Sequence, residues 1–409
     1  MTRRLTLCHT SDWHLGHTLA GHGREAEHAA FLDFLLDVLE RESVDALLVA
    51  GDVYDSANPP ASAQAMLYAF LARARRRSPA LDVVMIAGNH DSPGRLSAAD
   101  PILRAIGVRV IGTAREDMLV PVSDAAGVAG WVAAVPFLRP SDLPRHPGEG
   151  DPIVAGVRAR YRAVLDAARA RRGPRDALVA MGHCHMVDAT PSELSERAIL
   201  GGPQQALPAD LFGDDVEYVA LGHLHLAQAV TERVHYSGSP IPLSLPEETY
   251  PHQVRVVRFE DGRLAEQRAH RVPRLVDVHR VPREGPAPLD DVLAALAALA
   301  VDADLPRERW PFVEARVRLT APAPDLRARV EAALADKPVR LVKIGVEHAG
   351  APGALADRAP RRQLHDLTVE EVFREAYARK YEGEPDAALL AAFHEVADAA
   401  RRALEENAS

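Results

Sequence analysis

Gly88-Asn89-His90-Asp91 and Gly222-His223-Leu224-His225 are the two stretches of this 409-residue sequence that decide its fold. Each follows a short apolar run, residues 83–87 and 216–221, that is typical of a buried strand. Because the carboxyl ends of neighbouring parallel strands share one edge of a sheet, we expect these side chains to meet. An apolar run followed by polar side chains occurs three more times. These segments are Asp12-Trp13-His14 after residues 5–8, Gly51-Asp52 after 46–50 and Gly182-His183 after 177–181.

The side chains at this edge are carboxylates, imidazoles and a carboxamide, a donor set that suits Mn²⁺, Fe²⁺ or Mg²⁺ better than structural zinc. Hydrolysis of a phosphodiester needs a nucleophile, charge neutralisation and leaving-group stabilisation. Two divalent ions about 3.5–4 Å apart supply all three. One carboxylate has to be shared between the ions, and Asp52 is the candidate. The sequence therefore predicts a two-metal phosphoesterase.

This prediction depends on the five segments together. A single Gly-Asp or Gly-His after a strand is usually a turn or a hydrogen-bonded histidine. His183 and His185 compete for one ligand position, and His183 is favoured because it directly follows a glycine, as Asp52 and His223 do. Cys184 is interpreted as a small buried thiol and not as a ligand.

The composition argues against several classes of protein. No apolar run approaches the roughly 20 residues of a membrane helix, and no signal-peptide pattern occurs, so we expect a cytoplasmic protein without membrane contact. The two cysteines, Cys8 and Cys184, do not make a disulfide framework and fit a reducing compartment. A net charge of −10 argues against indiscriminate nucleic-acid binding but is compatible with a local basic groove.

The order of predicted elements divides the chain. Residues 1–272 alternate strands and helices, which is typical of a layered α/β domain. From residue 273 to 348 the alternation restarts without ligand residues, which predicts a smaller second domain. Residues 349–363 are a linker, and residues 364–409 predict two amphipathic helices that have to dock on the body or on a partner. The predicted helices are 25–42, 60–77, 154–172, 289–300 and 323–335, and the further strands are 131–135, 234–238, 275–281, 311–320 and 339–346.

Several of these stretches together resemble the calcineurin-like metallophosphoesterases. Within that family the sequence is similar to the DNA nuclease subunits that work with an SbcC-type ATPase. The resemblance covers all of residues 1–272, and beyond them mainly the order of the elements, with a local match at residues 367–373. Besides the ligand motifs it includes His9-Thr10-Ser11, Arg24-Glu25-Ala26-Glu27-His28, Pro136-Phe137-Leu138-Arg139-Pro140 and Gly238-Ser239-Pro240-Ile241-Pro242.

The resemblance implies a four-layered α/β/β/α core, a small α+β capping domain that positions DNA and a C-terminal helical hairpin. It further implies that His90 stabilises the transition state or protonates the leaving 3′ oxygen, with Asp91 orienting His90. The Cys184-His185 pair departs from the family pattern, which is more apolar there. The implied ligands are Asp12, His14, Asp52 and His225 for one metal, and Asp52, Asn89, His183 and His223 for the other.

The implied activity is that of a DNA nuclease in repair and recombination. It would use two Mn²⁺ ions, with Mg²⁺ or Fe²⁺ as alternatives, as a 3′→5′ exonuclease on duplex ends and an endonuclease on single strands or hairpins. The implied partners are DNA, an SbcC-type ATPase bound by residues 364–409, and a second copy of the chain within a heterotetramer. Helices 25–42 and 60–77 are candidates for the dimer surface.

Two other classes of function stay open from the sequence. A small-molecule phosphodiesterase or a protein phosphatase would use nearly the same ligands, although the extra domain and helical hairpin disfavour it. A scaffold for the ATPase with a dormant site is the non-catalytic alternative, which the intact ligand set disfavours.

Overall fold

The computed structural model describes residues 2–114, 117–144, 151–191, 206–348 and 377. The chain divides into two compact units, Met1–Val317 with Ala323–Val346, and Arg318–Pro322 with Glu347–Ser409. The predicted linker and C-terminal helices, residues 349–409, lie outside the described residues except for Tyr377. The first unit contains two six-stranded sheets, a smaller sheet and a short hairpin.

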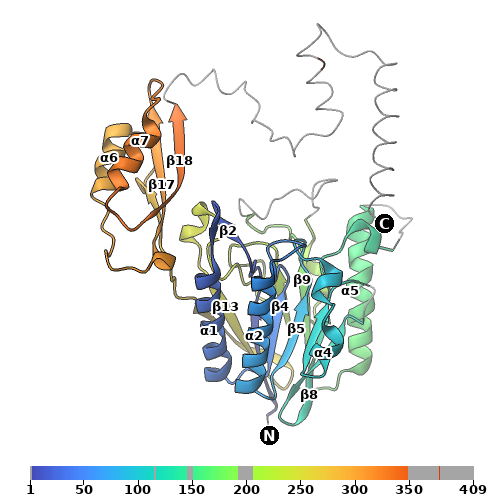
Figure 1. Ribbon diagram of the computed structural model, residues 1–409. Helices are drawn as coiled ribbons and strands as arrows, with labels where there is room; N and C mark the ends of the chain where they lie inside the picture. Colours follow the sequence, from blue (N-terminus) through green and yellow to red (C-terminus); the bar gives the residue numbers. More distant parts are fainter. Residues whose placement is uncertain (1, 115–116, 145–150, 192–205, 349–376, 378–409) are drawn as a thin grey trace. The chain divides into compact units, whose positions relative to one another are not determined.

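The first six-stranded sheet has the order β14-β13-β1-β4-β5-β6. Strands β1, β4, β5 and β6 are parallel, whereas β13 is antiparallel to both β1 and β14. Loops that carry predicted ligands follow β1, β4 and β5 at the same edge of this sheet (Figure 1). The strands are β1 (Arg4–Thr10), β4 (Ala46–Ala50), β5 (Asp82–Ile86), β6 (Val108–Ile111), β13 (Gln253–Glu260) and β14 (Arg263–Arg271).

The second six-stranded sheet has the order β11-β12-β10-β9-β8-β7. Its four central strands are parallel, and the edge strands β7 and β11 are antiparallel to their neighbours. Strand β9 ends at His183, and β10 ends directly before His223, so both strands lead to predicted ligands. The strands are β7 (Leu119–Asp124), β8 (Gly127–Ala134), β9 (Ala177–His183), β10 (Tyr218–Gly222), β11 (Gln228–Ala229) and β12 (Val234–Tyr236).

The burial of β4 shows how the layers are stacked. All five residues of this strand are buried, and successive side chains point to opposite faces of the sheet. Ala46, Leu48 and Ala50 belong to the apolar core that includes the second sheet, whereas Leu47 and Val49 belong to the core beneath two helices. A strand with both faces covered needs apolar residues at every position, which explains the continuous apolar run in the sequence.

Helices cover the outer faces of the paired sheets. The buried residues of α1 (Glu25–Arg41) and α2 (Ala61–Arg77) pack on the first sheet, and those of α5 (Pro152–Arg171) pack on the second (Figure 1). The predicted α/β/β/α core is therefore confirmed. The remaining elements of this region are β2 (Thr18–Leu19), β3 (His22–Gly23), α3 (Pro93–Leu96), α4 (Asp100–Arg104) and the 3₁₀ turns η1 (Pro140–Asp142), η2 (Ala209–Phe212) and η3 (Leu245–Thr249).

A four-stranded sheet follows β14 in the chain. Strand β15 is parallel to β17, and β16 and β18 also pair with β17. The predicted alternation of strand and helix is present here, with β16 as an additional short strand, while the role of residues 273–348 as a capping domain stays a prediction. The elements are β15 (Val278–Val281), β16 (Ala287–Pro288), α6 (Leu289–Ala297), η4 (Arg307–Arg309), β17 (Phe312–Leu319), α7 (Leu326–Leu334) and β18 (Arg340–His348).

Two expectations from composition concern the described residues directly. Cys8 is buried, and neither Cys8 nor Cys184 forms a disulfide. Within the described ranges, no helix has both the length and the apolar character that crossing a membrane requires.

Two valines of β8 provide a matched test of the packing between the layers. Val132 is fully buried in the core that contains both sheets, whereas Val128 in the same strand is 39% exposed. We expect Val132→Ala to lower the free energy of unfolding by about 2 kcal/mol, because it removes buried methyl groups and leaves a cavity. Val128→Ala should change it by about 0.5 kcal/mol or less. Urea denaturation of both variants measures this difference, and equal losses would contradict the assigned layers.

Candidate metal centre

All seven predicted ligands lie where the edges of the two large sheets meet. Those of the first sheet come from loops after parallel strands, and those of the second come from the end of β9 and the loop after β10. The last four residues of each of these strands are buried, so the folded core fixes the starting point of each loop. The first sheet contributes Asp12, His14, Asp52 and Asn89, and the second contributes His183, His223 and His225.

Four of the seven have a left-handed backbone. The φ angles are 53° at Asp12, 47° at His14, 48° at Asp52 and 99° at His223. Residues other than glycine rarely adopt this conformation, which occurs preferentially at functional sites. Hydrogen bonds from Asp12 N to Gly51 O and from His14 N to Asp52 O, both 3.0 Å, hold two of these turns together. The loops after β1 and β4 therefore form one connected unit.

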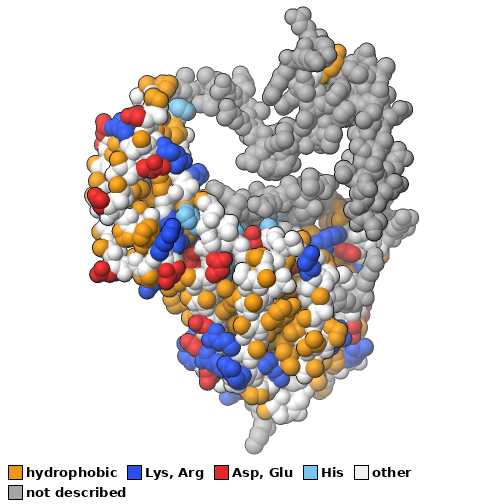
Figure 2. All heavy atoms as spheres, in the orientation of Figure 1, with side chains coloured by type: hydrophobic (Ala, Val, Ile, Leu, Met, Phe, Trp, Pro, Cys, Tyr) orange, Lys and Arg blue, Asp and Glu red, His pale blue; other side chains and the backbone are white. Residues whose placement is uncertain are grey.

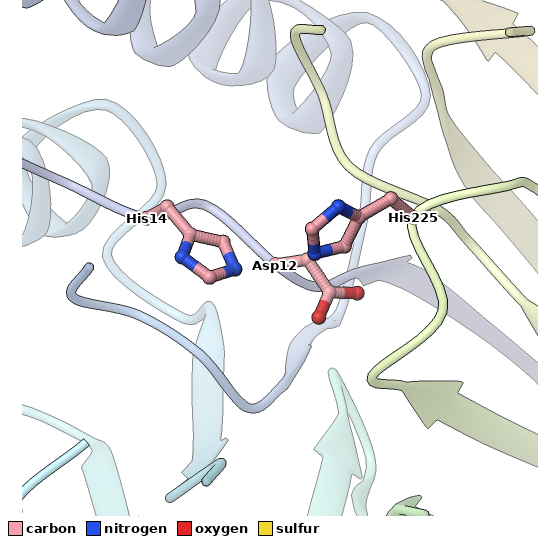
Figure 3. Close-up of side chains that lie close together, drawn as sticks. All are labelled: Asp12, His14 and His225. Atoms are coloured by element: carbon pink, nitrogen blue, oxygen red, sulfur yellow. The ribbon is translucent and has the colours of Figure 1, made fainter. Parts of the chain in front are cut away.

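The first group of donors is Asp12, His14 and His225, whose ligand atoms lie within 4.8 Å of one another. Figure 3 shows the Asp12 carboxylate close to the His225 ring, with the His14 imidazole beside them. All three residues are buried, and His14 Nε2 has no hydrogen-bond partner among the described residues. Leaving a buried polar nitrogen unpaired costs free energy. A cation bound at this nitrogen would remove the cost, so the group fits a metal site.

Asp52 lies at the centre of the full set. Its Oδ2 atom is 3.5 Å from His14 Nε2 and 3.3 Å from His183 Nε2. His183 Nε2 is also 2.9 Å from Asn89 Oδ1, and His223 Nδ1 is 3.1 Å from the same oxygen. One Asp52 oxygen thus faces a donor of each predicted metal set, which is the position that a shared carboxylate has to occupy.

Comparisons with known proteins show which family the chain belongs to. A protein-family model described as calcineurin-like phosphoesterase matches residues 5–227. The chain belongs to the calcineurin-like phosphoesterases. A second family model, SbcD_C, described as type 5 capsule protein repressor C-terminal domain, matches residues 274–381.

Within the calcineurin-like phosphoesterases, the chain belongs with the proteins named as the SbcD component of the SbcCD nuclease. The protein of that name from Rhodobacter capsulatus is 40% identical over 91% of this chain and 94% of its own length. The one from Escherichia coli K12 is 31% identical over 91% of this chain and 93% of its own length. The one from Bacillus subtilis is 34% identical over 64% of this chain and 68% of its own length.

His90 is only partly buried and lies close to two residues of this phosphoesterase's donor set, His14 and Asp52. One of its ring nitrogens belongs to a group with His14 and Asp52 whose ligand atoms lie within 4.8 Å of one another. The rings of His14 and His90 are 4.7 Å apart, centre to centre. His90 Nδ1 donates to the backbone oxygen of Asp55 at 2.8 Å, which fixes the orientation of the imidazole.

No described hydrogen bond joins Asp91 to His90, so its predicted orienting role stays a prediction. The buried carboxylate of Asp91 instead accepts hydrogen bonds from the backbone N–H groups of Gly88, Val53 and Tyr54, at 2.9–3.2 Å. Among the described hydrogen bonds, the one that fixes the His90 ring goes to the Asp55 carbonyl group. Asp91 joins the loop after β5 to the loop after β4.

The ambiguity around His183 has a geometric answer. His183 lies beside Asp52, whereas His185 belongs to none of the three donor groups found among the described residues. The backbone at His185 accepts a hydrogen bond from Leu207 N at 2.8 Å. The half-buried Cys184 has its sulfur 3.9 Å from Met186 Sδ and also belongs to none of these groups.

Two carboxylates of the site were missed from the sequence. Asp55 Oδ1 is 3.2 Å from His14 Nδ1, and Glu247 Oε1 is 3.0 Å from His225 Nδ1. Asp55 follows Asp52 by three residues, a spacing without a distinctive signal. Glu247 follows Ser244 by three residues, and this pattern alone indicates a helix start and not a metal site.

The buried charges perturb one another strongly. Burial by itself lowers the pKa of His183, but the Asp52 carboxylate outweighs this effect and raises that pKa to about 9. Burial likewise favours neutral Asp52, yet His183 and His14 hold the pKa of Asp52 well below its usual range. Burial and the charge of Asp52 raise the pKa of Asp91 to about 6.

The raised pKa of His183 predicts that metal binding releases protons. At pH 7 its imidazole carries two protons because its pKa is about 9, and a cation bound at Nε2 has to displace one of them. We expect Mn²⁺ affinity to rise with pH up to about 9 and calorimetric binding heats at pH 7 to depend on the ionisation enthalpy of the buffer. His183→Asn should release fewer protons. Heats independent of the buffer would contradict this prediction.

Proposed function

We propose that this phosphoesterase is a two-metal DNA nuclease, a 3′→5′ exonuclease on duplex ends and an endonuclease on single strands or hairpins. The observation that carries the proposal is the position of Asp52 Oδ2 between His14 and His183. The relatives' shared name, which makes each of them part of the SbcCD nuclease, supports DNA as the substrate. The donor set supports Mn²⁺ as the preferred ion, with Mg²⁺ or Fe²⁺ as alternatives.

The ligand charges favour a phosphate substrate. Only two of the assigned ligands, Asp12 and Asp52, are carboxylates, so they would not neutralise the four positive charges of two divalent ions, which would attract a phosphate oxygen; the carboxylates of Asp55 and Glu247 lie behind ligand histidines. The bound ions supply Lewis acidity to the phosphoryl group and lower the pKa of water. We assign one ion to Asp12, His14, Asp52 and His225, and the other to Asp52, Asn89, His183 and His223.

His90 is the proposed general acid. Its Nδ1 carries a hydrogen because the Asp55 carbonyl oxygen can only accept a hydrogen bond. This leaves Nε2 as the atom that can hold the transferable proton. The ring is only partly buried, as is the side chain of Asn89, whereas the other six assigned ligands are buried, so His90 is accessible to a bound strand. The proton would go to the 3′ oxygen that leaves phosphorus.

Substitution of His90 tests this role. We expect His90→Asn to slow Mn²⁺-dependent cleavage of linear duplex DNA by about 10²–10⁴-fold, the usual contribution of a general acid. Mn²⁺ binding should persist because His90 is not an assigned ligand. Gel assays of cleavage and calorimetry of Mn²⁺ binding, each on the full chain, measure the two effects. An unchanged cleavage rate would reject the assignment.

The same preparation separates the proposed function from its alternatives. Wild-type protein with Mn²⁺ is assayed on linear duplex DNA and on a chromogenic phosphodiester. Activity on the chromogenic compound alone would favour a small-molecule phosphodiesterase. A protein that binds Mn²⁺ but cleaves neither substrate would favour the scaffold.

We also propose that this nuclease works with an SbcC-type ATPase. The names of the relatives and the SbcD_C match at residues 274–381 support this partner. In this proposal residues 273–348 position the duplex, and residues 364–409 bind the ATPase. Two copies of the chain would form the centre of a heterotetramer.

An exposed apolar face supports the proposed dimer. It includes α2, which was predicted for the dimer surface, and α4, which was not, whereas the described large exposed hydrophobic side chains include none from α1. Figure 2 shows hydrophobic side chains gathered over α2 and α4. The large exposed side chains there include Tyr68, Ile102 and Ile106, of which Ile102 is 73% exposed. Exposed apolar patches of this kind are frequent at protein–protein interfaces.

Removal of residues 364–409 tests the proposed docking segment. We expect the shortened chain to lose co-purification with an SbcC-type ATPase, because it lacks the amphipathic helices predicted there. Basal Mn²⁺-dependent cleavage should remain, since every assigned ligand precedes residue 226. Co-purification at the wild-type level would reject this segment as the docking site.

A further inference from the structure

Three of the four ligand histidines have a described partner on the side that faces away from the donor set, and the kind of partner differs between the two proposed cation positions. His14 Nδ1 and His225 Nδ1 each meet a carboxylate, Asp55 at 3.2 Å and Glu247 at 3.0 Å. His183 Nδ1 instead meets the backbone oxygen of Ala50 at 2.9 Å. The two cation positions are therefore supported differently.

Glu247 is held rigidly in place. It is fully buried, and its carboxylate accepts hydrogen bonds from Leu243 N at 2.8 Å and Ser244 Oγ at 3.0 Å. Its backbone oxygen is 3.1 Å from His252 Nε2. A carboxylate fixed by this many contacts cannot turn away from His225, and burial protects its charge from screening by salt.

A carboxylate behind a ligand histidine has two effects on a bound cation. An ionised carboxylate only accepts hydrogen bonds, so it keeps the hydrogen on Nδ1 and leaves the lone pair of Nε2 for the cation. It also makes the imidazole a more basic ligand. A backbone carbonyl fixes the tautomer in the same way but adds no net charge.

The second position has a nearby carboxylate of a different kind. Asp91 is buried next to Asp52, but its oxygens accept hydrogen bonds from three backbone N–H groups. These dipoles offset its charge, and no described hydrogen bond joins it to a ligand imidazole. Asp12 belongs to donor groups on both sides and does not distinguish the two positions.

We propose that Glu247 and Asp55 are positioning residues that make the site of Asp12, His14 and His225 the tighter of two unequal cation sites. The tighter site fills first, and the site of Asn89, His183 and His223 fills at higher metal concentration. This inference rests on the two-metal function proposed above. Glu247 has the larger effect, because the Asp55 side chain is 35% exposed and its charge is better screened.

The test is a titration of the full chain with Mn²⁺, with the free ion followed by electron paramagnetic resonance. We expect two classes of site in the wild-type protein. Glu247→Gln should weaken the tight class by about 10–100-fold and leave the weak class unchanged. Glu247→Ala should weaken the tight class further, because glutamine keeps a hydrogen-bond acceptor and alanine does not. Asp55→Asn should weaken the tight class by a smaller factor.

Glu217→Gln is the matched control. Glu217 is also largely buried, accepts a hydrogen bond from Leu264 N at 3.0 Å and pairs with Arg263 at 2.6 Å. It precedes β10, whereas His223 follows that strand, so its charge lies at the far end from the donor set. This variant should titrate with Mn²⁺ as the wild type does. Thermal unfolding without added metal verifies that each variant is folded.

The possible outcomes separate this inference from the proposed function. Two equal classes in the wild type, or a Glu247→Gln effect on the weak class alone, would overturn the inequality of the sites but leave a two-metal enzyme. Absence of Mn²⁺ binding by the wild type would overturn the two-metal function itself. If Glu247→Gln does not fold, the Mn²⁺ titration of Asp55→Asn tests the inference, because the Asp55 side chain is half-exposed. An unchanged affinity of the tight class in that variant counts against the inference.

Discussion

The close approach of loop backbones at the meeting edges of the two sheets determines the geometry of the donor set. A Cβ atom on Gly88 would overlap the carboxylate and the backbone nitrogen of Asp52, and one on Gly222 would overlap the backbone oxygen of Ala50. Only glycine fits at either place. The Asp52 carboxylate can therefore lie beside His14 of the first sheet and His183 of the second, and the predicted ligands need no long side chains to reach one another.

The same constraint explains why the convergence of the candidate ligands could be predicted from the sequence. A buried parallel strand is a continuous apolar run, and the required glycine follows it directly before the ligand, as in Gly51-Asp52 and Gly222-His223. The apolar run predicts which edge of the sheet the loop leaves from, and the glycine identifies where two loop backbones come closest. The predicted strand 46–50 matches β4 for this reason, and the predicted helix 25–42 matches α1 because its apolar stripe faces the core.

Other parts were not predicted because their roles depend on contacts between distant residues. Asp55 contacts His14 across 41 positions of sequence, and Glu247 contacts His225 across 22. Neither has a local pattern that distinguishes it from an ordinary turn or helix start. The hairpin of β13 and β14 was missed for another reason, because its arginines and glutamates obscure the alternation. Its turn residues, Asp261 and Gly262, have φ angles of 48° and 78°, and Asp-Gly is a strong hairpin signal that was available.

Asp91 contacts the loops that carry the candidate ligands through their backbone. Three backbone N–H groups from two separate loops converge on one carboxylate, much as backbone nests bind phosphate or sulfate. The buried Asp91 carboxylate thus holds the loop after β4 and the loop after β5 together. An Asp91 variant would lose the hydrogen bonds that hold the two loops together, so a loss of turnover in it would not by itself identify a proton relay.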